Sequence, residues 1–179
     1  MNDFPILNQT PSAEDLYLVG FRLDPDSEGP QFYTLFAFGG DNERPITTVG
    51  DRVVFFTRPE LSQRALEIGD PSMQALGEVP EDLDMLCDIA QTMYLINAES
   101  EDSDKIIVDC LEVVDDLVRA TRLSMPPLYQ EALSDLMAHL QRTHMYGEFL
   151  RDEGSRERLE DALLWCVGAI TMKSTMLSE

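Results

Sequence analysis

Carboxylates recur at one helical spacing in two neighbouring parts of the chain, and no other pattern is better suited to chemistry. Each set occupies positions i, i+3 and i+7. The two sets are Glu81, Asp84 and Asp88, and Asp109, Glu112 and Asp116. Residues at these intervals share one face of an α-helix. Carboxylates on facing helices of a bundle can hold Mg²⁺ or a pair of metal ions, the basis of metal-dependent hydrolysis.

The helices that must position these carboxylates are predicted to turn them toward solvent. Residues 81–98 and 103–122 have helical periodicity, with apolar side chains on one face and acidic side chains on the opposite face. A divalent cation needs roughly four or more converging oxygen ligands. Acids that point away from the apolar seam of a bundle supply only part of such a shell. The sequence therefore favours a solvent-facing acidic surface over a metal centre, and no cofactor is expected.

The main functional prediction is a non-enzymatic binding module whose acidic helical face engages a basic partner protein. Like charges one helical turn apart, such as Glu112 and Asp116, repel each other by roughly 0.2–0.5 kcal/mol. A basic partner would neutralise such a face, as in inhibitors and immunity proteins that block basic nucleases or toxins. The residues predicted to bind the partner are Asp84, Asp88, Asp109, Glu112, Asp115 and Asp116.

Two alternatives stay open. The E-x-x-D pattern at Glu81–Asp84 and Glu112–Asp115 resembles that of some all-helical nucleotide pyrophosphohydrolases, and the resemblance is confined to this pattern. It implies a divalent-metal-dependent nucleotide hydrolase whose metal ligands would be Glu81, Asp84, Glu112 and Asp115. The other alternative is a salt-adapted structural protein with no specific use for its charge, because eleven arginines but only two lysines accompany the acidic excess.

The charge balance excludes several classes of partner. Asp and Glu number 34 against 13 Lys and Arg, and the formal net charge is −21. Residues 81–116 alone hold twelve carboxylates and a single base, Lys105. Nucleic acids and anionic membrane surfaces attract basic proteins, so neither is an expected partner.

The chain is expected to be a cytoplasmic protein with free thiols. No stretch approaches the roughly 20 apolar residues that cross a bilayer. The first residues include Asp3 and Pro5, where a signal peptide would be basic and then apolar. Cys87, Cys110 and Cys166 are far apart and sit among apolar residues, as buried free thiols do.

The predicted fold class is α+β. Residues 1–13 are expected to be an extended arm, and residues 14–79 a small antiparallel β-meander with one covering helix. Residues 80–179 are expected to form a bundle of about four helices that share a core with the meander. Within that bundle Ala162–Met172 is apolar on nearly all sides, and together with Met176 it would allow a homodimer seam.

The individual elements follow from turn and cap residues. Gly50-Asp51 predicts a tight hairpin, and Thr57 with Glu60 predicts a capping box at the start of a helix. The predicted strands are 15–23, 31–38, 46–49 and 52–56. The predicted helices are 58–68, 81–98, 103–122, 126–151 with a break at Gly147, and 155–177.

Overall fold

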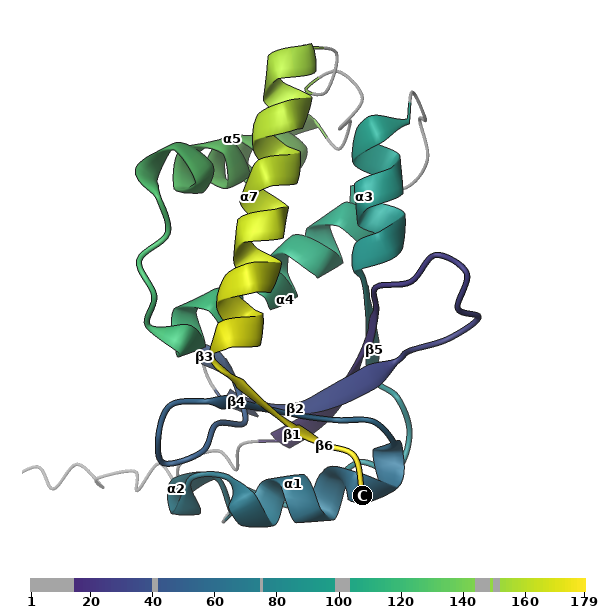
Figure 1. The fold of residues 1–179 in the computed structure, drawn as a ribbon, viewed down its shortest axis with the longest axis vertical. Helices are drawn as coiled ribbons and strands as arrows, with labels where there is room; N and C mark the ends of the chain where they lie inside the picture. Colours follow the sequence, from purple (N-terminus) through teal and green to yellow (C-terminus); the bar gives the residue numbers. More distant parts are fainter. Residues whose placement is uncertain (1–14, 40–41, 75, 99–103, 144–148, 150–151) are drawn as a thin grey trace, which may run out of the picture.

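The computed structural model of the protein describes residues 15–39, 42–74, 76–98, 104–143, 149 and 152–179 (Figure 1). The strands are β1 (Asp15–Arg22), β2 (Phe32–Gly39), β3 (Asn42–Pro45), β4 (Val53–Phe56), β5 (Met85–Asp88) and β6 (Ser174–Leu177). The helices are η1 (Pro59–Leu61), α1 (Ser62–Ile68), α2 (Pro71–Gln74), α3 (Ile89–Asn97), α4 (Asp104–Thr121), α5 (Pro127–Thr143) and α7 (Glu153–Met172).

The sheet is mixed, with strands in the order β5-β1-β2-β4-β6 and with β3 paired to β2. β1, β2, β3 and β4 pair antiparallel. The strand predicted over 46–49 is wrong, because β3 lies just before it and Thr47 makes no more than an isolated bridge to Val53. β5 joins the free edge of β1 in parallel, and β6 joins β4 in parallel. The α+β class is confirmed, but a purely antiparallel meander is wrong, because two strands from the segment predicted to be a helical bundle, residues 80–179, complete the sheet.

The sheet separates two layers of helices (Figure 1). α1 and α2 cover one face, and α3, α4, α5 and α7 pack together on the other face. Alternate residues of β1 serve the two layers: Leu16 and Leu18 belong to the core beneath α1, whereas Val19 and Phe21 belong to the core of the C-terminal helices. The burial of both faces explains why these strands are apolar almost throughout.

The segment predicted as a helix over 81–98 is two elements. Met85–Asp88 forms β5, and the helix α3 starts only at Ile89. The apolar residues at 85–88 are compatible with a helix or a strand. They form a strand because their backbone pairs with β1 and extends the sheet. As a result, Glu81 and Asp84 lie before β5 and do not share a helical face with Asp88.

The last predicted helix is also too long. α7 ends at Met172, and residues 174–177 form the edge strand β6 beside β4. The predicted capping box is absent, because no side chain caps the start of η1. Pro59 occupies the first turn of this helix, where proline is well tolerated. The expected arm at 1–13 and the break at Gly147 lie outside the described residues.

Several local predictions are confirmed. Residues 59–68 are helical, and α4 closely matches the predicted 103–122. The turn at Gly50-Asp51 brings the Thr48 amide to the Arg52 carbonyl oxygen, and Asp51 adopts a positive φ of 56°. In the part of the chain that the structure describes, no helix is long and apolar enough to span a membrane.

Candidate functional site: an acidic surface on α4

The outer face of α4 carries the acidic side chains that the sequence assigns to it. Glu112 and Asp115 are exposed, and Asp109 and Asp116 are partly buried at the edges of the same face. The inner face buries the helix in the core through Ile107, Cys110, Leu111, Val113, Val114, Leu117 and Val118. The separation of apolar and acidic residues along this helix therefore follows the prediction.

A fifth carboxylate joins this face from another element. Glu43 lies on β3, which packs beside α4, and its charge raises the pKa values of both Glu112 and Asp116. We use the name acidic α4 surface for the five residues Glu43, Asp109, Glu112, Asp115 and Asp116. The sequence analysis missed Glu43, because nothing in the sequence pairs β3 with a helix that starts some sixty residues later.

Two bases partly neutralise the acidic α4 surface. Lys105 forms an ion pair with Asp109 one helical turn away, and Arg119 pairs with both Asp115 and Asp116. The Lys105 side chain is 75% exposed and that of Arg119 is 66% exposed, so water and salt screen the pairs. Within the described residues, Glu43 and Glu112 form no ion pair with any base.

The local potential disfavours ionisation of two of these carboxyls. Partial burial, followed by repulsion from Asp109 and Glu43, raises the pKa of Glu112. Burial, with repulsion from Glu43, Asp115 and Glu112, raises the pKa of Asp116 to about 6 even though Arg119 opposes the shift. An ionised carboxylate here has lost part of its hydration without gaining full compensation from a cation.

Asp84 has a structural role that the sequence does not reveal. Its backbone amide donates to the Leu18 carbonyl oxygen at 2.9 Å, and its Oδ2 accepts from the Leu18 amide at 2.8 Å. The side chain thus takes the place of a neighbouring strand at the point where β5 has not yet begun. Because this carboxylate is occupied within the sheet, it is poorly suited to a partner or a metal ion.

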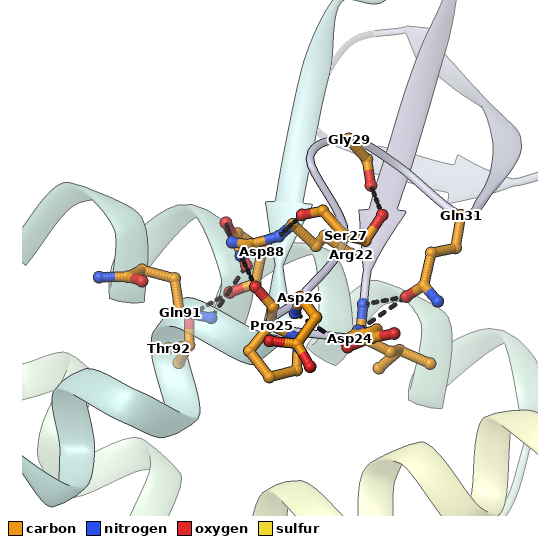
Figure 2. A network of polar contacts seen from close by, with 11 residues as sticks. Arg22, Asp24, Pro25, Asp26, Ser27, Gly29, Gln31, Asp88, Gln91 and Thr92 are labelled. Carbon is orange, nitrogen blue, oxygen red and sulfur yellow. Dashed lines mark hydrogen bonds and ion pairs between the residues drawn. The ribbon is translucent and has the colours of Figure 1, made fainter.

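Asp88 also has a structural role, as part of the polar network shown in Figure 2. Its Oδ1 accepts from the Gln91 amide at 2.9 Å and caps α3, while its Oδ2 pairs with the Arg22 Nη1 at 2.8 Å. Arg22 also donates to the carbonyl oxygens of Ser27 and Pro25. The pair therefore fixes the β1–β2 loop against the junction between β5 and α3.

The proposed metal ligands are not assembled as a site. Glu81 lies in the loop before β5, and the Asp84 carboxylate is bonded to β1 rather than aimed at α4. Among the residues that the structure describes, no three His, Cys, Asp or Glu side chains are grouped so that they could hold a metal ion. The hydrolase alternative required Glu81 and Asp84 to lie on a helix beside α4. The structure places both residues before β5, so this helix is wrongly predicted.

Comparison with known proteins shows the fold and nothing further. No protein-family model and no curated protein matches the chain. A solved structure, described as the crystal structure of the SatS C-terminal domain in complex with bromine, has a TM-score of 0.55 and 10% sequence identity to this chain. The alignment covers 93% of this chain and 94% of that one. At this identity the similarity concerns the backbone arrangement alone.

Proposed function

We propose that the protein is a binding module whose acidic α4 surface engages a basic partner protein. The observation that carries the proposal is the clustering of Glu43, Glu112 and Asp116 from two separate elements; among the described residues, Asp116 alone of the three forms an ion pair, with Arg119. All five residues of the acidic α4 surface are assigned to partner binding. Asp84 and Asp88 are left out of it because both carboxylates already serve the fold.

Electrostatics favours a partner rich in arginine or lysine. A cationic side chain placed between Glu43 and Glu112 would offset the burial and the repulsion from Asp109 and Glu43 that together raise the pKa of Glu112. The same contact would make ionisation of Asp116 easier, so association near pH 6 would release a proton. The net charge of −21 would also speed the encounter with a basic protein through long-range attraction.

The unfavourable ionisation of Asp116 argues against a purely solvating role for these acids. Charges that serve only solubility do so best when they are fully hydrated and spread over the surface. Asp116 instead keeps only 14% of its side chain exposed, beside four other carboxylates. Binding sites often retain such locally unfavourable groups, because the partner supplies the missing compensation.

The salt dependence of capture tests the proposal. The immobilised wild-type protein is expected to retain a basic protein from its own cell extract at low salt and to release it as the salt concentration rises. The reason is that the Debye length falls to about 10 Å at 0.1 M and about 3 Å at 1 M salt, which screens exposed charges. The measurement is the amount of each retained protein, quantified by mass spectrometry across a salt series.

Two outcomes would contradict the proposal. Retention that is independent of salt would mean that apolar contacts, and not the acidic α4 surface, hold the partner. An absence of retained basic proteins, together with a melting temperature that climbs steadily into molar salt, would favour the salt-adapted structural protein.

A further inference from the structure

Two of the three cysteines meet inside the core. Cys87 on β5 and Cys110 on α4 place their Sγ atoms 3.8 Å apart, although 23 residues separate them in the sequence. Both residues are fully buried, and both are free thiols. Most other residues of this core cluster are branched aliphatic or aromatic. Side chains of that kind could also fill the positions of the two cysteines, so packing alone does not require two thiols in contact.

The two thiols differ in how readily each loses its proton. The Cys87 thiol donates toward Cys110, and this bond lowers the pKa of Cys110 against the effect of burial. The same bond and burial raise the pKa of Cys87. Cys166 on α7 contrasts with Cys110, because burial raises its pKa to about 12. Of the three thiols, Cys110 is therefore the one that loses its proton most readily.

We propose that Cys87 and Cys110 are a redox-active dithiol that a peroxide converts into a disulfide between β5 and α4. A disulfide bond of about 2.05 Å requires the two sulfurs to approach by about 1.8 Å from their present separation. Rotation of the two side chains, with a small shift of β5, supplies movement of this size. β5 is an edge strand that pairs only with β1, and edge elements open locally more readily than central ones.

The reaction balances with hydrogen peroxide as the oxidant. The Cys110 thiolate attacks one peroxide oxygen and becomes a sulfenic acid, with hydroxide as the leaving group. The Cys87 sulfur then attacks the sulfenyl sulfur, the S–S bond forms, and a second hydroxide leaves as the Cys87 proton is lost. In total, two thiols and one hydrogen peroxide give one disulfide and two waters, with two electrons passing to the peroxide. The thiol Cys166 takes no part.

Thiol counting and linkage mapping test this proposal on the folded, full-length protein. Wild-type protein is treated with hydrogen peroxide, quenched with catalase, denatured and alkylated. One alkylated cysteine, Cys166, is expected in place of the three found before oxidation, together with a non-reduced peptide that links Cys87 to Cys110. Treatment with a dithiol reductant should restore all three alkylation sites.

Two variants sharpen the result. Cys166→Ala should give the same linked peptide and leave no alkylated cysteine, whereas Cys110→Ala should leave both of its remaining cysteines alkylated. Oxidation of the wild type in denaturant provides a further control, because loss of the fold should allow links to Cys166. The proposal is overturned if the folded wild type keeps three alkylated cysteines, links either residue to Cys166, or yields only irreversible oxidation products. The wild-type map decides this even if a variant does not fold.

Discussion

Replacement of Asp88 by alanine is expected to lower the free energy of unfolding by about 3–5 kcal/mol. The change leaves the Arg22 guanidinium, whose side chain is only 19% exposed, without its carboxylate. It also removes the cap that accepts from the Gln91 amide, a contribution of about 1 kcal/mol. Small domains have only about 5–15 kcal/mol of stability in total, so the loss should be plain in urea denaturation.

Two controls separate the partly buried Arg22–Asp88 ion pair from general effects of charge removal. Asp88→Asn keeps an oxygen that can cap α3, so it should cost less than Asp88→Ala while still weakening the pair with Arg22. Lys105→Ala breaks the exposed pair with Asp109 and should change stability far less than Asp88→Ala does, because water screens that pair. If Asp88→Ala lowered the free energy of unfolding no more than Lys105→Ala does, the Arg22–Asp88 pair would not stabilise the fold as we describe.

Asp116→Asn is expected to have the opposite effect and to stabilise the protein at pH 7. The carboxyl of Asp116 has a pKa of about 6 in the folded protein against 3.8 in its unperturbed state. Such a shift corresponds to at most about 3 kcal/mol against the ionised form, and we expect a gain of about 1–3 kcal/mol because water screens part of it. The measurement is the free energy of unfolding of the variant and the wild type in urea.

The pH dependence gives the sign of this effect. Because the folded pKa is raised, the Asp116 carboxyl favours the native state while it is protonated, below about pH 4, and that contribution is lost as the pH rises through about 6. The advantage of Asp116→Asn should therefore be largest at pH 7 and vanish below pH 4. Asp115→Asn is the matched control, since this side chain is 61% exposed and also pairs with Arg119. An equal, pH-independent gain in both variants would contradict our explanation.

The sequence was sufficient to predict α4 and its acidic face. The regular separation of apolar and acidic residues over 104–121 has one physical solution, an amphipathic helix against a core. β1 and β2 were equally predictable, because apolar and β-branched residues flank a strong turn. In these segments the local conformational preference and the burial of apolar side chains favour the same secondary structure, so a prediction from sequence is reliable.

The edge strands β5 and β6 show where such reasoning fails. Each has four residues, and each lies next to a helix in the chain, so a helical period can be continued through it. Their state is decided by partners far away in sequence, β1 for β5 and β4 for β6. Hydrogen bonding to an existing sheet outweighs a weak local preference.

The residues of the candidate site also fall into those that the sequence predicts and those that it does not. Asp109, Glu112, Asp115 and Asp116 could be predicted, because a single helix places them on one face. The fifth member, Glu43, could not be predicted, since its proximity depends on how β3 packs against α4. Asp84 and Asp88 were predicted to share the acidic face, but the structure places them in contact with Leu18 and Arg22, a use within the fold that the sequence pattern does not reveal.

The most direct test of the central claim compares two triple variants that remove the same charge from opposite faces of the protein. The first neutralises the acidic α4 surface with Asp109→Asn, Glu112→Gln and Asp116→Asn. The second neutralises three exposed residues in or near η1, α1 and α2 with Glu60→Gln, Glu67→Gln and Glu78→Gln. Both variants are used as bait in parallel with the wild type, at low salt and in the same cell extract.

We expect the α4 triple variant to lose the basic proteins that the wild type retains, while the second triple variant keeps them. Circular dichroism and urea denaturation of each bait would establish that both remain folded. Retention by the α4 triple variant would contradict the account, because its acidic surface would then be dispensable. Equal loss in both variants would also contradict it, since net charge and not the acidic α4 surface would then govern binding.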